Sequence, residues 1–303
     1  MARMRLIGCR MTMFCFRISE LGEEHGIETK MKVLVNSLAK SGTHLLGTFL
    51  ERLGFIESVP GLTGAQVRET NRNPFRNWQK RQRRPKQNEI GFWIDLDIKG
   101  NAVSKEWLHG RLSSIPDGCF ISSHLPYSTE LADFIHLHDF KILNIHRDPR
   151  DVIISFINYE KSNKELPFHE DFKRMSMDAA LEQVLRGAKR GNFASAPLRD
   201  RIERMMGWLG DQRVYSTTFE SLVGPKGGGC KSRQRDAAMG ICRHIGFSVI
   251  HSRLDEVVET IFDPRSQTFS KGMVGQWKEI IGPAQLDKVM ANMGDFISTL
   301  GYD

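Results

Sequence analysis

A Lys-Ser-Gly-Thr segment at residues 40–43 has the residue types of a phosphate-binding turn. An apolar run over 32–38 precedes it and predicts a strand, and an amphipathic pattern over 44–53 predicts a helix after it. A turn between two such elements presents free backbone N–H groups, the positive end of a helix dipole and a lysine cation at one point. We therefore expect a phosphate to bind at this turn, in contact with Lys40, Ser41, Gly42, Thr43 and His44.

The order of these residues differs from the Walker A motif, in which the Lys follows the last Gly of a glycine-rich loop. Here Lys40 precedes Gly42, and no glycine upstream completes the Walker pattern. We therefore expect a phosphate-bearing ligand other than ATP or GTP. A nucleotide-dependent phosphotransferase stays open as an alternative, and magnesium-dependent ATP turnover would support it.

A second cationic site is predicted around Arg147, which follows an apolar run over 141–145. Ser155 lies eight residues further on, about two turns into the helix expected after Pro149. A guanidinium is always charged and binds a phosphate through two parallel hydrogen bonds, so Arg147 and Ser155 together suit a phosphate. Taken alone, the segment is better explained by an Arg–Asp network at a helix N-terminus. The turn at 40–43 favours the phosphate interpretation, because a ligand with two separate phosphates needs two sites.

Two further segments carry candidate site residues. His124 follows an apolar run over 118–123, which predicts a short buried strand. After Lys271, the residues Gly272 and Gly275 lie three positions apart ahead of a tryptophan. Such a segment suits a loop that lays its backbone against a ligand, although by itself it also fits an ordinary turn before the last helix.

The pattern along the rest of the chain predicts the elements that position these residues. A further strand is expected over 213–219, and helices are expected over 178–190, 198–209, 233–245, 253–262 and 283–299. Because strands alternate with helices, we predict a single α/β domain with a central, mostly parallel sheet and helices on both faces. The carboxyl ends of parallel strands meet at one edge, so Lys40, His124 and Arg147 are expected to face one pocket.

Composition narrows the class of ligand and setting. The formal net charge of +7 over 303 residues suits an anionic ligand. A basic stretch over 68–86 leaves a nucleic-acid-binding protein open, but we interpret it as a solvated loop and expect no nucleic acid partner. The five cysteines are scattered without a C-x-x-C pair, which predicts neither a disulfide framework nor a zinc site and favours a reducing, cytoplasmic setting.

The first thirty residues mix basic and apolar side chains without the apolar core of a signal peptide. We interpret residues 1–30 as a disordered leader and residues 31–303 as the folded domain. No apolar run along the sequence approaches the length that crosses a bilayer.

Jointly, these segments resemble the sulfotransferases that use 3′-phosphoadenosine 5′-phosphosulfate (PAPS). The donor loop of that family reads Pro-Lys-Ser-Gly-Thr-Thr-Trp, against Ala-Lys-Ser-Gly-Thr-His-Leu at 39–45. Its catalytic histidine stands in Thr-His-Leu-Pro, against Ser-His-Leu-Pro at 123–126. Its 3′-phosphate site pairs an Arg with a Ser eight residues on, as Arg147 and Ser155 do here. Its signature Arg-Lys-Gly-x-x-Gly-x-Trp-Lys is matched at 270–278, with Ser in first place.

Some positions depart from the family pattern. Leu45 replaces the tryptophan that stacks on adenine, and Ser270 replaces the first arginine of the last signature. Ser122 stands where many cytosolic members carry a lysine. Segment 218–222 resembles the family's Tyr-Glu-Asp-Leu segment, which implies that Phe219 packs on the adenine.

The resemblance implies a P-loop-kinase-like fold in a short, bacterial-like form, and in-line transfer of a sulfuryl group from PAPS to a hydroxyl or amine. The product would be 3′,5′-adenosine bisphosphate, and no metal would be needed. His124 would be the general base, with an ordinary pKa of about 6.5, and Lys40 would stabilise the leaving phosphate. The 5′-phosphate would be held by the turn at 40–43, and the 3′-phosphate by Arg147, Ser155, Lys271 and Gly272.

The sequence does not identify the acceptor, for which a small molecule and a glycan are both open, or the oligomeric state. A nucleotide-binding module without catalytic activity is a further alternative, and binding without transfer to any acceptor would support it.

Overall fold

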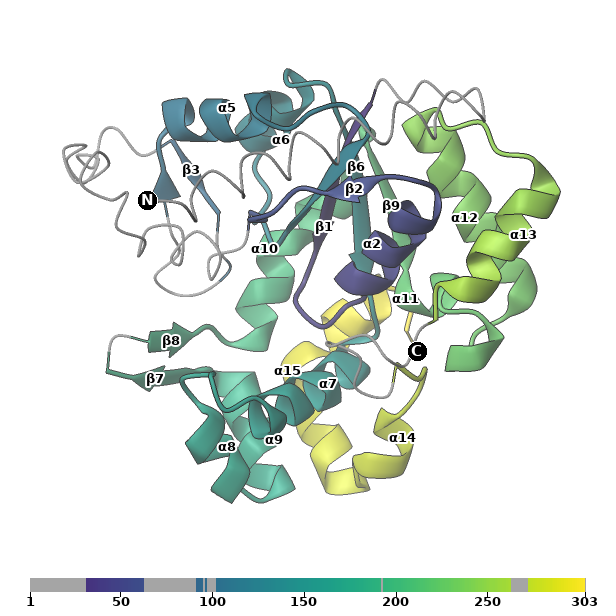
Figure 1. Ribbon diagram of the computed structural model, residues 1–303. Coiled ribbons are helices and arrows are strands. Elements are labelled where there is room, and N and C mark those ends of the chain that lie inside the picture. Colours follow the sequence, from purple (N-terminus) through teal and green to yellow (C-terminus); the bar gives the residue numbers. More distant parts are fainter. Residues whose placement is uncertain are drawn as a thin grey trace, which may run out of the picture.

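A five-stranded sheet lies at the centre of the computed structural model, with strand order β2-β5-β1-β6-β9 (Figure 1). Every pairing in this sheet is parallel. The structure describes residues 31–62, 91–94, 96, 102–191, 193–262 and 272–302. The strands of the central sheet are β1 (Lys32–Ser37), β2 (Ile56–Glu57), β5 (Cys119–Ser123), β6 (Phe140–His146) and β9 (Val214–Thr218). The predicted α/β domain with a mostly parallel sheet is confirmed.

Helices cover both faces of this sheet, as the alternation of strands and helices predicts (Figure 1). The α-helices of the described residues are α2 (Thr43–Arg52), α5 (Lys105–Ser113), α6 (Thr129–His136), α7 (Pro149–Ser162), α8 (His169–Arg174), α9 (Met177–Arg186), α10 (Leu198–Gly210), α11 (Phe219–Leu222), α12 (Lys231–Ile245), α13 (His251–Thr260), α14 (Trp277–Ile280) and α15 (Pro283–Thr299). Of these, α8, α9 and α14 lie away from the sheet and pack on other helices (Figure 1). A short 3-10 turn, η2, spans Pro225–Gly227. Among the described residues, no helix is both long enough and apolar enough to cross a membrane.

Successive residues of β1 point to opposite faces of the sheet and enter two separate cores. Val33 and Val35 pack with residues of α2, α12 and α13 on one face. Leu34 packs with residues of α6, α7, α10 and α15 on the other. Both faces are therefore buried, which is why this strand reads as a continuous apolar run rather than as an alternating one.

The helix expected over 178–190 is too long. Helix α9 ends at Arg186, and Gly187 follows with φ 78°, a left-handed conformation that favours glycine. A Cβ at Gly187 would lie 2.5 Å from the Ser195 carbonyl oxygen. The chain then forms a two-stranded hairpin of β7 (Ala188–Arg190) and β8 (Phe193–Ser195). A second hairpin pairs β3 (Phe92–Trp93) with β4 (Ala102–Val103).

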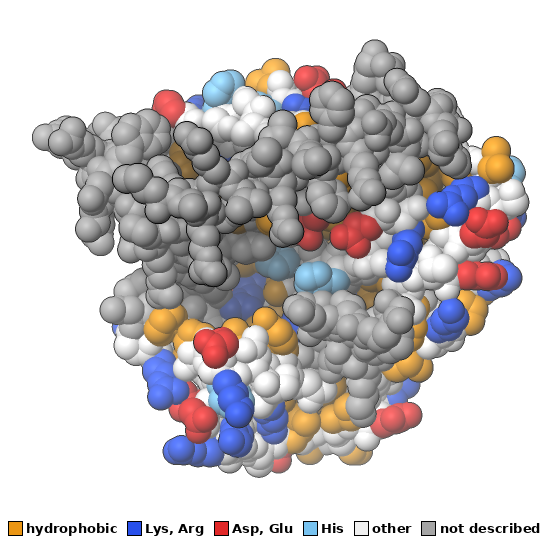
Figure 2. Space-filling model, viewed as in Figure 1, with side chains coloured by type: hydrophobic (Ala, Val, Ile, Leu, Met, Phe, Trp, Pro, Cys, Tyr) orange, Lys and Arg blue, Asp and Glu red, His pale blue; other side chains and the backbone are white. Residues whose placement is uncertain are grey.

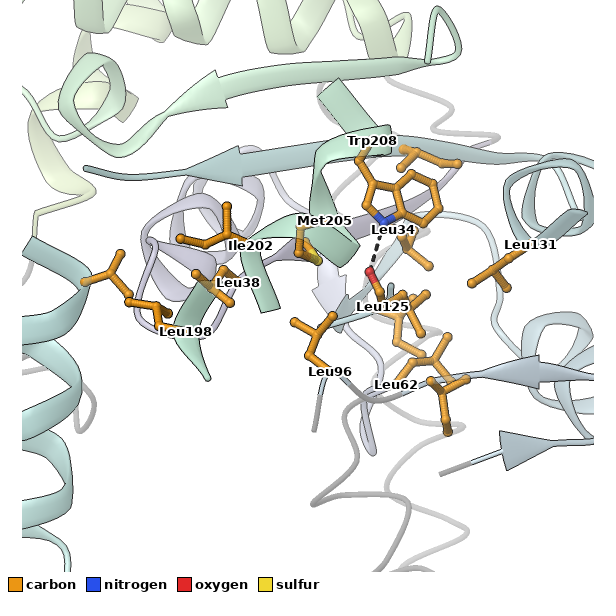
Figure 3. Packing of buried hydrophobic residues seen from close by; sticks show 14 of the residues in the cluster. Leu34, Leu38, Leu62, Leu96, Leu125, Leu131, Leu198, Ile202, Met205 and Trp208 are labelled. Atoms are coloured by element: carbon orange, nitrogen blue, oxygen red, sulfur yellow. Dashed lines mark hydrogen bonds between the residues drawn. The ribbon is translucent and has the colours of Figure 1, made fainter. Parts of the chain in front are cut away.

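The backbone after β5 is fixed by buried polar contacts, which matters because His124 lies there. The indole Nε1 of Trp208 donates to the Leu125 carbonyl over 2.8 Å (Figure 3). Asn36 Oδ1 accepts from the Leu125 N–H and from the Ser123 hydroxyl, each over 2.8 Å. Trp208 is fully buried, and the apolar side chains around it come from several elements (Figure 3). The ends of β1 and β5 are thereby locked together.

Candidate active site

The turn between β1 and α2 has the backbone geometry of an anion-binding loop. Lys40 has φ 73° and Gly42 has φ 110°, so both residues are left-handed. Gly42 is the N-cap of α2, and the Ser41 N–H closes the turn on the Leu38 carbonyl over 3.1 Å. The Thr43 hydroxyl lies 2.5 Å from the Ser37 hydroxyl. The first N–H groups of α2 lack partners within their own helix, and they lie where the sequence predicted a phosphate.

We expect a Gly42→Ala substitution to weaken binding of adenosine 3′,5′-bisphosphate about tenfold or more, measured by isothermal titration calorimetry. A Cβ on Gly42 would lie 3.0 Å from both Ile145 Cδ1 and Phe219 Cδ2, on a backbone that L-residues rarely adopt. The loop must therefore shift. Gly54 is the matched control, because it has φ 101° and a Cβ there meets nothing within 4 Å. Equal losses in Gly42→Ala and Gly54→Ala would contradict a specific role for the turn.

His124 lies directly after β5 and faces the end of β1. Its Nδ1 is 2.7 Å from the Ser37 carbonyl oxygen. A carbonyl only accepts, so Nδ1 carries the proton in the neutral ring and Nε2 keeps its lone pair. Burial lowers the pKa of His124 to about 4, with the Ser37 carbonyl opposing this and the charges of His44, Arg201 and Lys40 adding to it. The expected ordinary pKa of about 6.5 is wrong, because the ring is desolvated and surrounded by cations. The ring is therefore neutral throughout the physiological pH range.

Lys40 contacts an aromatic ring that the sequence analysis did not include. Its Nζ lies 3.9 Å from the ring centroid of Tyr159, on α7. Burial lowers the pKa of Lys40 to about 8, and the positive charge of Arg147 adds to this effect. The side chains of Lys40 and Arg147 therefore act on each other across the same edge of the sheet. Tyr159 lies four residues after Ser155, which puts both on one face of the helix. This spacing is the feature of the sequence that could have indicated Tyr159 as a site residue.

Arg147 follows β6 and is nearly buried. Its guanidinium lies 4.2 Å from the ring centroid of Phe219, the first residue of α11. One of its nitrogens donates to the Met273 carbonyl over 2.7 Å and lies 3.5 Å from Asp151 Oδ2. Ser155 is half-buried about two turns along α7. Arg147 therefore joins β6, α11 and the segment over 272–277.

Several buried polar atoms have no hydrogen-bond partner within the described part of the chain, and three of them lie at or beside the end of β6 or in the turn after β1. They are His146 Nδ1, the Ser41 hydroxyl and Arg147 Nε, and the last two lie one in each predicted phosphate site. Buried donors without partners are uncommon in folded proteins, and at a binding site a ligand satisfies them. A ligand with two phosphates fits this donor set.

Of the remaining residues that the sequence indicated, the structure describes some and not others. His44 lies on the second position of α2, and burial lowers its pKa, with Glu57 opposing and Lys40 adding to the shift. Gly272 has φ 58° and begins the described C-terminal segment. Lys271, the basic stretch over 68–86 and the leader lie outside the described residues.

In the described ranges, no three His, Cys, Asp or Glu side chains are grouped as a metal site would require.

Figure 2 shows histidine side chains and a Lys or Arg side chain beside a hollow near the middle of the displayed face. Cationic and imidazole groups therefore gather at one place on the surface.

A family model described as a sulfotransferase domain matches residues 30–295. The chain belongs to the sulfotransferase family. The match spans the turn after β1, His124 and Arg147, so the resemblance seen in the sequence is confirmed. No curated protein sequence matches this sulfotransferase significantly.

Solved structures of known proteins share the fold of this sulfotransferase. Mouse sulfotransferase SULT7A1, complexed with PAP, is 18% identical with a TM-score of 0.55, over 87% of this chain and 85% of that chain. Retinol dehydratase in complex with androsterone and inactive cofactor PAP is 15% identical with a TM-score of 0.51, over 88% and 80%. Retinol dehydratase in a complex with retinol and PAP gives 15% identity and a TM-score of 0.51, over 89% and 82%. The expected sulfotransferase-like, P-loop-kinase-like architecture is confirmed.

Proposed function

We propose that this sulfotransferase transfers a sulfuryl group from PAPS to a hydroxyl or amine of a small-molecule acceptor, with a glycan as the alternative. The observation that carries this proposal is the meeting of Lys40 and Arg147 at one sheet edge. Each cation comes from a different strand end, and each lies in a site with a buried polar atom, Ser41 Oγ or Arg147 Nε, that has no hydrogen-bond partner among the described residues. A nucleotide with phosphates at both its 5′ and 3′ positions spans two such sites. The structures of SULT7A1 and retinol dehydratase hold PAP, which supports this donor class.

In the proposed reaction, the acceptor oxygen or nitrogen attacks the sulfur, and the bond from sulfur to the bridging oxygen of the 5′-phosphate breaks. The acceptor proton passes to Nε2 of His124, because Nδ1 is engaged with the Ser37 carbonyl. Lys40 stabilises the negative charge that grows on the bridging oxygen. Protonated His124 then returns its proton to solvent, and adenosine 3′,5′-bisphosphate leaves.

The donor is proposed to bind along the strand ends. The backbone of the turn at 40–43 and the side chain of His44 hold the 5′-phosphate. Arg147, Ser155, Lys271 and Gly272 hold the 3′-phosphate. Leu45 and Phe219 provide the apolar surfaces for adenine, and the buried position of Phe219 beside Gly42 and Arg147 supports that role.

Two observations support a small-molecule acceptor: the ligands of retinol dehydratase and the aromatic surface near His124. The complexes of retinol dehydratase with retinol and with androsterone show small apolar alcohols bound to a protein of this fold. Phe156, on α7 and partly buried, offers aromatic surface near Arg201, whose charge acts on His124. A screen of phenols, sterols and short glycans with labelled PAPS would identify the acceptor.

A thermal-shift titration tests the donor class directly. Adenosine 3′,5′-bisphosphate at about 100 times its Kd should stabilise the folded protein by about 2.7 kcal/mol, without Mg²⁺. ATP with Mg²⁺ should give a much smaller shift. Stabilisation by ATP and Mg²⁺ alone would overturn the proposal in favour of a phosphotransferase.

The alkaline limb of kcat/KM should fall with a pKa of about 8, the value for Lys40 in the free protein. Lys40 acts as a cation, so activity is present below this pKa and is lost as pH rises through it. The charged and titratable groups beside Lys40 are Arg147, His44, His124 and Tyr159. Lys40→Arg should move this limb to higher pH, because a guanidinium stays protonated. An unmoved limb would assign it to another group.

A further inference from the structure

Asp151 is a fully buried carboxylate in the first turn of α7, four residues after Arg147. Both of its oxygens accept backbone hydrogen bonds from the C-terminal segment. Oδ2 accepts from the Gly275 N–H over 2.7 Å, and Oδ1 accepts from the Trp277 N–H over 3.0 Å. Oδ2 also lies 3.5 Å from a guanidinium nitrogen of Arg147. One side chain therefore joins the strand-end arginine to a segment more than 120 residues away in the sequence.

The segment over 272–277 is held at several points along its length. The Met273 carbonyl accepts from Arg147, and the Val274 N–H donates to the Gly227 carbonyl over 2.9 Å. The indole Nε1 of Trp277 donates to Asp148 Oδ2 over 3.1 Å. Among the described residues, Asp151 is the acceptor for the N–H groups of both Gly275 and Trp277. Because Gly275 has φ 74°, its N–H direction depends on a glycine-specific turn.

A buried carboxylate is costly unless hydrogen bonds and a counter-ion compensate it. Burial raises the pKa of Asp151, and the Arg147 guanidinium and the two backbone donors offset part of this effect. The same carboxylate contacts all three donors, so moving it would break the contacts with the segment and with Arg147 together. The geometry is that of a clamp between the two parts of the predicted 3′-phosphate site.

We propose that Asp151 is a positioning residue for the donor: it holds the 272–277 segment against Arg147 and so forms the site for the 3′-phosphate. This inference rests on the proposed function, since it assigns Asp151 to the far phosphate of the same nucleotide. Asp151 itself does not touch the phosphate in this assignment. It acts through Arg147 and through the backbone of Gly272 to Trp277.

The charge of Asp151 and its position predict opposite results. A carboxylate 3.5 Å from Arg147 repels a phosphate bound there, so by charge alone Asp151→Asn should tighten phosphate binding. If Asp151 positions the segment, the same substitution should weaken binding, because an amide cannot accept from both Gly275 and Trp277. The direction of the change therefore distinguishes the two roles.

The test compares two nucleotides by isothermal titration calorimetry, adenosine 3′,5′-bisphosphate and adenosine 5′-phosphate, which lacks the 3′-phosphate. Asp151→Asn should weaken binding of the bisphosphate about tenfold or more and change binding of the monophosphate by less than about twofold. Tighter or unchanged binding of the bisphosphate, or equal weakening of both nucleotides, would overturn the proposal. If the wild-type protein binds both nucleotides equally, the donor assignment fails as well.

Asp211→Asn is the matched control, because Asp211 is also a nearly buried, arginine-paired carboxylate. It accepts from Arg213 over 2.6 and 2.9 Å, ahead of β9 and at the opposite end of that strand from the site. This control should leave the ratio of the two affinities unchanged. A second variant, Asp151→Glu, keeps the charge but displaces the carboxylate. It should lose affinity for the bisphosphate as Asp151→Asn does, and wild-type affinity in this variant would overturn a positioning role.

Discussion

Replacing His124 with alanine is expected to lower kcat about 10²–10⁴-fold and to leave the affinity for adenosine 3′,5′-bisphosphate within about twofold. The imidazole is neutral because burial lowers its pKa, and the Ser37 carbonyl holds the proton on Nδ1. Only Nε2 is then available to accept the acceptor proton. Alanine removes that atom without touching the phosphate turn. Single-turnover assays with labelled PAPS would measure the rate, and calorimetry would measure the affinity.

His136→Ala is a suitable control, since His136 is an exposed residue at the end of α6 and takes no part in the proposed reaction. It should retain wild-type turnover. A His124→Ala variant that loses donor affinity and turnover to the same extent would show that the ring has a structural role. Retained turnover would remove it from the reaction altogether.

The second large effect is expected from Lys40→Met, which should lower kcat about 10²–10³-fold. Methionine keeps most of the length of the side chain but removes the positive charge, and with it the cation that lies over the Tyr159 ring. The charge that develops on the leaving phosphate would then lack its nearest cation. Lys40→Arg should retain more activity than Lys40→Met, because it keeps the charge while changing the shape.

Rapid-quench measurement of a single turnover separates chemistry from product release in these variants. Lys40→Met should slow the chemical step itself. A variant in which only the steady-state rate falls, with an unchanged single-turnover rate, would assign Lys40 to product release instead.

The sheet and the main site positions could be predicted from the sequence because their signals are local. Apolar runs end at the candidate site residues, and the Lys-Ser-Gly-Thr turn lies between a strand and a helix as expected. The order of the parallel strands then brought Lys40, His124 and Arg147 to the same edge. These inferences needed only the period of a strand and the direction of its end.

Contacts between distant elements could not be predicted in this way. The ring of Tyr159 meets Lys40, and the carboxylate of Asp151 meets Gly275, only because α7 packs across the strand ends. The acidic pKa of His124 depends on desolvation and on charges from two other segments, Lys40 and His44 around the start of α2 and Arg201 on α10, none adjacent to it in sequence. The end of α9 at Gly187 depends on a hairpin whose strands pack the glycine closely. Each of these features depends on tertiary packing rather than on residue pattern.

Ser37 touches both halves of the proposed reaction centre: its carbonyl meets His124, and its hydroxyl meets Thr43 of the proposed donor turn. It is the last residue of β1, which lies in the middle of the sheet with a neighbour on each side. The proposed proton-accepting residue and the proposed donor turn are therefore both held by hydrogen bonds to the same residue of a central strand. Loops at the periphery can diversify to admit new acceptors while the distance between base and leaving group stays the same.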